Sequence, residues 1–292
     1  AFVLYLLMMI AIGAFYAKGN NNSEDYFLGG RKLNGFVAAL PAQASDMSGW
    51  LLMGLPGAIY LTGVGGDGWI AIGLFIGTTL NWLFIATKLR RYTIRANNSV
   101  TLPTYFENRF HDEKKVLMTV SSITIVVFFL VYCASALSAG GQLFESVFGI
   151  DYHVALTIGA LVVLVYTFLG GFTAVCVTDF IQGMLMFAAL VIVPIAAAFN
   201  TPGLSSDFIV SLGGDNFLNL FADASGKVAL VTIISGLVWG LGYFGMPHIL
   251  VRFMAIKDSA MIKKSRIIAM IWVVITLVAA VCVGVIGLAF LG

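Results

Sequence analysis

The sequence predicts an all-α integral membrane protein, and three observations support this fold class. The composition is the first, because 60% of the 292 residues are hydrophobic, only 10% are charged, and the mean hydropathy is +0.99, beyond what a soluble domain needs for one core. The second is that the apolar residues form runs long enough for a helix to cross a hydrocarbon layer of about 30 Å. The third is that these runs lack the alternation of a membrane β-barrel, so helices must satisfy the backbone polar groups.

Eight apolar runs are candidate membrane-spanning helices, and no soluble domain remains between them. They cover residues 1–17, 35–60, 67–88, 115–147, 153–170, 177–200, 228–252 and 263–291. The first run has no charged segment before it and no small-residue cleavage site, so we interpret it as a spanning helix rather than a signal peptide. Because both ends of the chain lie inside apolar runs, we expect the chain to be a piece of a longer protein.

Lysine and arginine are distributed unevenly over the connections between the runs. The connections 18–34, 88–115 and 252–266 carry three, seven and five of them, whereas the alternate connections carry one in total. By the positive-inside rule, the three basic connections face the cytoplasm and the N-terminus lies outside. The clean division also supports the number of runs, because one missed helix would exchange the sides of all later connections.

Two of the runs, 35–60 and 228–252, are rich in glycine and proline and lie five runs apart. Their candidate helix breakers are Pro41, Gly49, Gly54 and Pro56 in the first run and Gly236, Gly240, Gly242, Gly245 and Pro247 in the second. Since the first run begins inside and the second outside, we expect two inverted repeat units, 35–200 and an incomplete 228–292, after a peripheral helix 1–17. Paired interruptions of this kind indicate discontinuous helices around a transporter's central site. The alternative is that glycine and proline only allow close packing.

Asp46 lies about midway along the first of these two runs. An ionised side chain at that depth costs roughly 2.5 to 3.5 kcal/mol on insertion scales, and no basic residue lies within two turns of it in the run. Na⁺ is bound by oxygen atoms, which the Asp46 carboxylate, the hydroxyls of Ser45 and Ser48, and carbonyls released near Gly49 can supply. The alternative interpretation is a protonated carboxyl group that is hydrogen-bonded to a neighbouring helix.

A second carboxylate, Asp179, is expected at the cytoplasmic edge of its run, where it is either solvated or a favourable charge at a helix N-terminus. An intramembrane aspartyl protease would need two carboxylates on facing helices that share a proton. The unequal depths of Asp46 and Asp179 argue against this class, as does the absence of a Gly-x-Gly-Asp motif at Asp67. His248 is expected to be a packing residue.

Aromatic residues at mid-depth are candidates for the walls of a binding site. Trp239 and Tyr243 are four residues apart and are expected on one face of a helix, while Tyr132 and Cys133 lie midway along a different run. Away from the headgroup regions, such residues are either packing residues or the lining of a site for a small apolar solute.

Four segments together resemble the sodium:solute symporter family, over nearly the whole chain. They are GGRKLNGFVAALPAQASDMSGWLLMGLPGAIY, TLPTYFENRF, VYCASALSAGGQLFESVFG and GLGYFGMPHILVRFMA. The stretch ASDMSGW with LPGA is specific to the family, and its combination with Tyr132, Trp239 and Tyr243 is close to specific for the proline-transporting members. The resemblance implies a leucine-transporter-type fold of five plus five core helices, the second half incomplete here, with one extra N-terminal helix.

The resemblance also implies the ligands of two sites. The carbonyl groups of Ala44 and Met47 would coordinate Na⁺, and Asp46 would be needed for sodium binding. Ser48 and Gly49 would affect the binding of both sodium and substrate. The remaining implied substrate-binding residues are Tyr132, Cys133, Trp239, Tyr243 and Pro247.

The same resemblance implies roles for two further residues, and it implies that family members have core helices beyond those in this chain. Arg31 matches a position tied to sodium coupling, and Asp179 matches a carboxylate on the cytoplasmic exit path of sodium. Family members have three more core helices, the first of which supplies a serine and a threonine of the sodium site. We therefore expect this chain to hold about half of the ion site.

The function that the resemblance implies is sodium-coupled import of L-proline across the cytoplasmic membrane by alternating access, without enzymatic activity. The expected partners are L-proline, Na⁺ and membrane lipid, and no nucleic acid. Within the same fold, the solute could instead be pantothenate, a sugar or another amino acid, and H⁺ could replace Na⁺. Alternatives from other classes are an intramembrane aspartyl protease and a passive channel.

Overall fold

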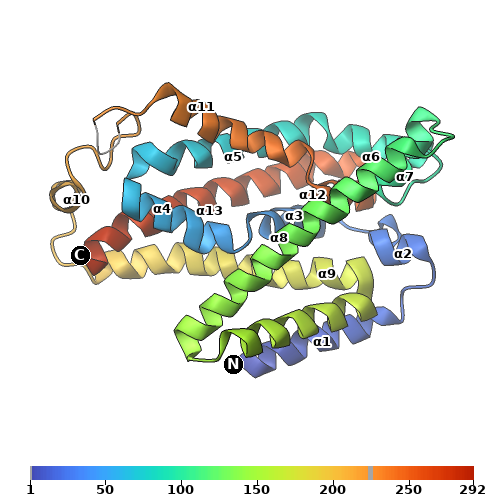
Figure 1. The fold of residues 1–292 in the computed structure, drawn as a ribbon, viewed down its shortest axis with the longest axis horizontal. Helices are drawn as coiled ribbons and strands as arrows, with labels where there is room; N and C mark the ends of the chain where they lie inside the picture. Colours follow the sequence, from blue (N-terminus) through green and yellow to red (C-terminus); the bar gives the residue numbers. More distant parts are fainter. Residues whose placement is uncertain (1, 223–225) are drawn as a thin grey trace. The chain divides into compact units, whose positions relative to one another are not determined.

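The computed structural model describes residues 2–222 and 226–292, and the regular elements in these residues are helices (Figure 1). This confirms the predicted all-α class. The chain divides into two compact units that are each discontinuous in sequence. Unit 1 comprises 1–41, 86–181 and 247–262, and unit 2 comprises 42–85, 182–246 and 263–292. The two units are described separately below, and the division into two repeats stays a prediction.

The helices follow one another along the chain, and the connection between α10 and α11, residues 214–229, is longer than the others. In chain order the α-helices are α1 (Phe2–Ala17), α2 (Ser23–Leu28), α3 (Gly35–Gly49), α4 (Leu55–Thr62), α5 (Val64–Phe84), α6 (Ala86–Arg95), α7 (Leu102–Phe110), α8 (Val116–Phe148), α9 (Tyr152–Phe199), α10 (Ser206–Gly213), α11 (Leu230–Val238), α12 (Pro247–Ala255) and α13 (Ile262–Leu291). A π-helical turn at Trp50–Gly54 joins α3 to α4, and the 3-10 segments are Gly29–Arg31, Trp239–Phe244 and Ser259–Met261.

In the part of the chain that the structure describes, four helical segments are long and apolar enough to cross a membrane. They are Val64–Arg95, Val116–Phe148, Tyr152–Phe199 and Ser259–Leu291, and a fifth is obtained if Leu230–Phe244 and Pro247–Ala255 count as one broken span. The 48-residue α9 contains two predicted runs, and Gly171, at φ 61° and ψ −156°, breaks its helical geometry between them. The loop expected at 171–176 is therefore a kink at a single glycine.

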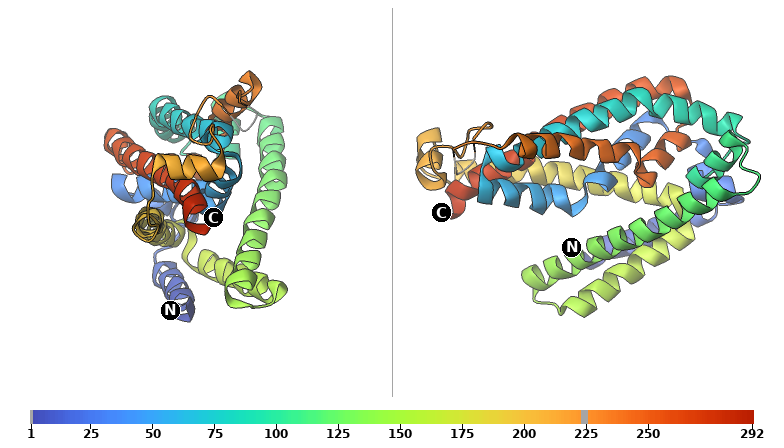
Figure 2. Two further views of the ribbon diagram at one scale, coloured as in Figure 1. Left: turned by 90° about the vertical axis from the view of Figure 1, so that its left-hand side faces the viewer. Right: turned by 45° about the horizontal axis from the view of Figure 1, so that its top comes forward.

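In unit 2, α5 packs against α11 and the 3-10 segment Trp239–Phe244, and α11 lies beside α5 in each view (Figure 2). Glycines make this approach possible. A Cβ atom added at Gly73 would lie 2.2 Å from the carbonyl oxygen of Gly236, and one added at Gly77 would lie 2.1 Å from that of Gly240. Two glycine pairs spaced four residues apart thus let the two backbones touch, as in close helix pairs of membranes.

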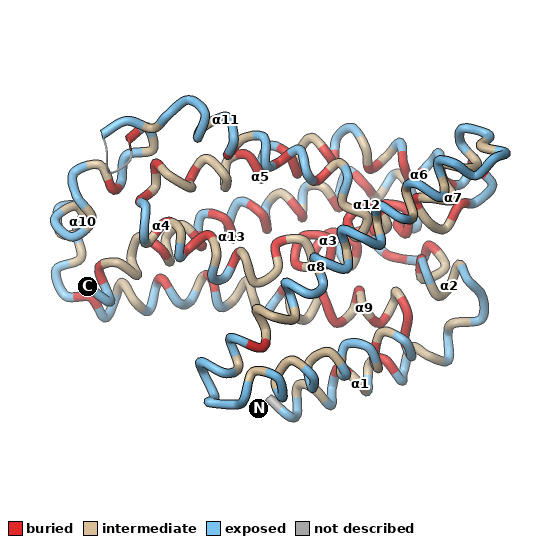
Figure 3. Tube along the Cα trace, in the orientation of Figure 1, coloured by how far each residue is buried: buried red, intermediate tan, exposed pale blue. Residues whose placement is uncertain are grey.

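In unit 1, α7 packs against α8 and α6 packs against α12. Along α8 the residues are almost all exposed or half-buried, and Gly141 is the buried one (Figure 3). Large apolar side chains such as Phe128 and Leu130 are more than two-thirds exposed, at 68% and 69%. An apolar helix surface of this size is of the kind that hydrocarbon or another apolar element covers.

Candidate functional site

The first glycine- and proline-rich run is broken beside Asp46, as predicted, and the break lies at Ser48. This residue has φ 44° and ψ −158°, a backbone region that is essentially restricted to glycine and costs about 1–3 kcal/mol for other residues. The π-helical turn Trp50–Gly54 follows directly. Pro41 does not break the run, because α3 continues through it at the loss of one backbone donor.

The residues around this break offer oxygen atoms to a cation. Across a helix break the regular i→i−4 hydrogen bonds are not all made, and carbonyl oxygens become available as ligands. Ala44 and Met47 are buried, at 8% and 2% exposure, whereas Asp46 and Ser48 are half-buried. Within residues 2–222 and 226–292, no group of three or more His, Cys, Asp or Glu side chains could hold a metal ion. A cation site at the break therefore depends on carbonyl and hydroxyl oxygens together with one carboxylate.

The second glycine-rich run is also broken, by the 3-10 segment Trp239–Phe244 between α11 and α12. Trp239 is 50% exposed, whereas Tyr243 is buried at 5%. The prediction that these two side chains share one helical face is therefore wrong. A 3-10 helix has three residues per turn, so side chains four positions apart point about 120° away from each other.

Within unit 2, an aromatic contact joins the two broken runs, and a hydrogen bond joins the second of them to α5. The ring of Trp50, at the start of the π-helical turn, lies 5.1 Å from the ring of Trp239 with a tilt of 58°. The buried Asn81 of α5 donates from Nδ2 to the carbonyl oxygen of Tyr243 at 2.8 Å. Trp50 and Asn81 are not among the residues that the sequence predicts for the site. The signal for Asn81 is an amide in the middle of an apolar run, where a polar group marks function or a specific partner.

Within unit 1, Tyr132 of α8 stacks on His248 of α12 at a centroid distance of 5.7 Å and an angle of 19°. Phe129 meets the same imidazole edge-on at 5.4 Å. His248 is thus a packing residue, as predicted. Cys133 is exposed in this unit. A pocket of about 510 Å³ is lined in part by Phe129, Pro247 and His248.

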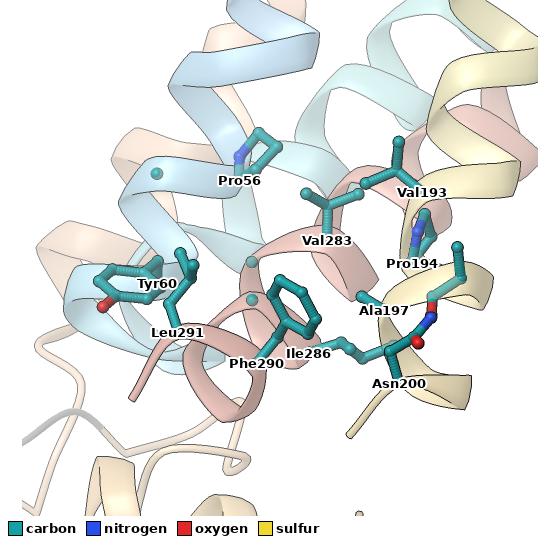
Figure 4. Close-up of a pocket in the computed structure, with 14 residues that line it drawn as sticks. Pro56, Tyr60, Val193, Pro194, Ala197, Asn200, Val283, Ile286, Phe290 and Leu291 are labelled. Carbon is teal, nitrogen blue, oxygen red and sulfur yellow. The ribbon is translucent and has the colours of Figure 1, made fainter. Parts of the chain in front are cut away.

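A larger cavity of about 600 Å³ lies in unit 2, between α4, the C-terminal part of α9 and α13 (Figure 4). Its lining is apolar, with Tyr60 and Asn200 as polar exceptions, and Pro56, Pro194 and Phe290 contribute to its walls. The lining residues include none of the sodium or substrate ligands predicted from the sequence. A cavity of this chemistry has no ligand set for Na⁺, so it does not belong to the candidate site.

Asp179 is not solvated and does not lie at a helix N-terminus, so both expectations for its surroundings are wrong. Because α9 resumes directly after Gly171, the carboxylate lies inside the helix and is buried, with a residue exposure of 9%. It forms an ion pair with Arg252 of α12, which is 3% exposed. Losing one partner of a buried pair costs about 3–5 kcal/mol, because the other charge stays buried.

Arg31 lies at the end of the 3-10 segment that follows α2 and is buried, at 7% exposure. Its Nε lies 3.2 Å from the Glu24 carboxylate and donates to Asn98 Oδ1 at 3.1 Å, and its Nη1 donates to the carbonyl oxygen of Met254 at 2.7 Å. Burial lowers the pKa of the Arg31 guanidinium, the positive charge of Arg90 lowers it further, and Glu24 opposes both. An arginine nevertheless stays protonated in proteins, so Arg31 is a buried permanent cation.

Comparison with known proteins relates the chain to a family of transporters. It matches the family model described as "Sodium:solute symporter family" over residues 26–292. It is 50% identical over 284 residues to the "High-affinity proline transporter PutP" of Bacillus subtilis (strain 168), a match covering 97% of this chain and 59% of that protein. It is 46% identical over 288 residues to the "Sodium/proline symporter" of Staphylococcus aureus (strain JH9), covering 98% and 55% of the two chains. The chain thus spans little more than half the length of these relatives.

A solved structure shares the fold of the chain. It is that of a Na⁺-coupled sialic acid symporter in its substrate-bound outward-open state, with a TM-score of 0.82 and 20% identity, and the match covers 98% of this chain and 60% of that one. This likeness confirms the leucine-transporter-type architecture that the sequence predicts.

Proposed function

The chain belongs to the sodium:solute symporter family, and on this premise we propose that the protein containing it imports L-proline together with Na⁺ across the cytoplasmic membrane. The two relatives at 50% and 46% identity are named for proline transport. The structural observation that supports the proposal most is the helix break at Ser48 beside Asp46. Holding a serine in a backbone region that disfavours it is costly, and such strain is concentrated at binding sites.

The sodium ligands of the proposed site are the carbonyl oxygens of Ala44 and Met47, with Asp46 supplying a negative charge. These atoms suit Na⁺ because hard cations bind oxygen. The ion in turn offsets the cost of an ionised carboxylate inside the membrane. The missing ligands would come from the part of the protein that this chain does not include.

The proline site of the proposal comprises Ser48 and Gly49 at the break together with aromatic and small residues of three other helices. Those residues are Tyr132, Cys133, Trp239, Tyr243 and Pro247. The contact between Trp50 and Trp239 supports this site, because it brings the break and the 3-10 segment together within unit 2. Aromatic walls with a few polar groups suit a small, largely apolar zwitterion.

Coupling follows from thermodynamic linkage. If bound Na⁺ favours the state that binds proline, proline strengthens sodium binding by the same factor. With the N-terminus outside, Arg31 lies on the cytoplasmic side and takes part in coupling, and Asp179 lies on the exit path of sodium. The membrane potential contributes about 2.3 kcal/mol per unit charge for each 100 mV. It therefore drives the inward movement of a cation with a neutral solute.

The rival classes find less support in the described residues. A protease of the aspartyl type needs two carboxylates that share a proton, whereas the Asp179 carboxylate is paired with the guanidinium of Arg252. A passive channel would not need a solute-sized site. Within the family, pantothenate, sugars and other amino acids are the competing solutes.

Uptake of radiolabelled proline by proteoliposomes that contain the full-length protein tests the proposal. We expect uptake that requires an inward sodium gradient, saturates with proline and is not competed by pantothenate or sugars. Equal uptake in sodium and potassium media would refute the choice of ion, and competition by another solute at lower concentration would refute the choice of substrate.

A further inference from the structure

The C-terminal end of α12 is held by donors from outside the helix. We call residues 254–257 the carbonyl row: residues 254 and 255 are the last two of α12, and residues 256 and 257 follow directly after it. Each of their carbonyl groups accepts a hydrogen bond from another part of unit 1. Arg90 of α6 provides two of these bonds. Its Nε donates to the carbonyl oxygen of Ile256 and its Nη2 donates to that of Lys257 at 3.0 Å.

The segment that precedes α3 provides the other two bonds of the carbonyl row. Arg31 donates from Nη1 to the carbonyl oxygen of Met254 at 2.7 Å. The backbone N–H of Leu33 donates to the carbonyl oxygen of Ala255 at 3.3 Å, and the N–H of Lys257 returns a bond to the carbonyl oxygen of Leu33 at 3.0 Å. Two arginines and one backbone bridge therefore satisfy four consecutive carbonyl groups.

The chemistry of this end suits arginine specifically. The last carbonyl groups of a helix have no partner within it and carry the negative end of its dipole, so cations stabilise them. Arg31 and Arg90 are 7% and 6% exposed, so water does not replace their hydrogen bonds. The planar guanidinium of Arg90 reaches two successive carbonyl groups at once, which the single ammonium group of a lysine cannot do in the same geometry.

The helix that is held in this way carries two of the proposed functional contacts. α12 has nine residues, and at 1.5 Å per residue it is about 13 Å long, too short to bend between its ends. It begins at Pro247, a residue of the proposed proline site, and its Arg252 pairs with Asp179 on the proposed sodium exit path. The position of the carbonyl row therefore sets the position of both contacts.

We propose that Arg90 is a positioning residue for transport, which acts jointly with Arg31 by holding the carbonyl row of α12. The inference rests on the proposed function. It gives the coupling role of Arg31 a physical basis, because Arg31 binds a carbonyl group in the last turn of α12 and Arg90 binds those of the two residues that directly follow this helix. Loss of Arg90 therefore reproduces the effect of losing Arg31.

Arg90→Lys in the full-length protein, reconstituted in proteoliposomes, tests the inference against Arg91→Lys as a matched control. Arg91 is the next residue of α6, is exposed, and donates to Ser259 Oγ at 3.4 Å. We expect Arg90→Lys to raise the sodium concentration for half-maximal proline uptake about tenfold, the change expected for losing one charge-assisted hydrogen bond. Arg91→Lys should stay close to the wild type.

The double variant Arg31→Lys/Arg90→Lys tests whether the two residues act together. Residues that share one structural effect give non-additive changes, so the combined rise in half-saturating sodium should be smaller than the product of the two single rises. A product of the single effects would overturn the joint action. An Arg90→Lys variant with the same sodium dependence as Arg91→Lys would overturn the inference altogether.

Hydrogen exchange of the wild-type protein provides a second measurement, which remains decisive if Arg90→Lys does not fold. The amides of Leu33 and Lys257, which bridge to the carbonyl row, should change their protection when sodium and proline are added; unchanged protection would contradict the inference. A wild type without sodium-dependent uptake would refute the proposed function and the inference with it, whereas normal wild-type uptake with normal Arg90→Lys uptake refutes the inference alone.

Discussion

Asn81 is a buried amide that contacts the 3-10 segment of the proposed proline site. Its side chain, at 1% exposure, holds the carbonyl oxygen of Tyr243 in the 3-10 segment, where the backbone has no regular α-helical partner. An amide in an apolar helix is retained at a cost in membrane insertion, so its bond to the 3-10 segment explains its presence.

Asn81→Leu should weaken proline binding about tenfold, because the Tyr243 carbonyl would remain buried without its donor. Binding of radiolabelled proline to the purified protein at saturating sodium measures the change. Thr79→Val, on the same helix but bonded to Phe75 and Met270, is the matched control and should bind proline normally. Equal losses in both variants would point to general damage of α5.

Asp46 lies two residues before Ser48, where the backbone of the first broken run leaves helical geometry. Asp46→Asn removes the charge and keeps the shape, so it should raise the sodium concentration for half-maximal uptake while high sodium restores proline transport. Sodium titrations of proline uptake measure both quantities. An unchanged half-saturating concentration would remove Asp46 from the ion site.

At the scale of elements, the ion pair between α9 and α12 is the clearest electrostatic link within unit 1. Asp179→Asn should destabilise the protein by about 3–5 kcal/mol, because Arg252 would stay charged and buried. Thermal unfolding of the purified protein measures this loss. Lys115→Gln, which breaks an exposed pair with Glu107 at 3.7 Å, should cost less than about 1 kcal/mol. Asp179→Leu with Arg252→Leu should recover much of the stability, since no unpaired charge remains.

The helix breaks show which structural features the sequence pattern predicts and which it does not. Glycine and proline correctly predicted both broken runs, because these residues disfavour a continuous helix. The exact break at Ser48 was not predictable, since a serine at positive φ is held there by the surrounding structure and not by its own preference. The face of Trp239 was mispredicted for a related reason: periodicity assumes 3.6 residues per turn, and the 3-10 segment does not have it. The partner of Asp179 lies 73 residues away along the chain, beyond any local pattern.

At the scale of the whole molecule, the distribution of positive charge leads to a prediction about orientation. With the N-terminus outside, a single cysteine at Lys114 should face the cytoplasm, and one at Asp215 should face the exterior. Both residues are exposed. In intact cells, with the native cysteines replaced by serine, a membrane-impermeant maleimide should label the Asp215 position only. Labelling of the Lys114 position instead would invert the topology.

Gly77 in α5 and Gly242 in the second broken run differ in how much space surrounds them. At Gly77 an added methyl group would meet the backbone of Gly240 at 2.1 Å, whereas at Gly242 no atom lies within 4 Å of such a group. The structure therefore leaves no room for a side chain at Gly77, whereas it leaves room for a methyl group at Gly242. In a saturation library of single codon changes, Gly77 should accept no other amino acid, and Gly242 should accept alanine without loss of growth on proline.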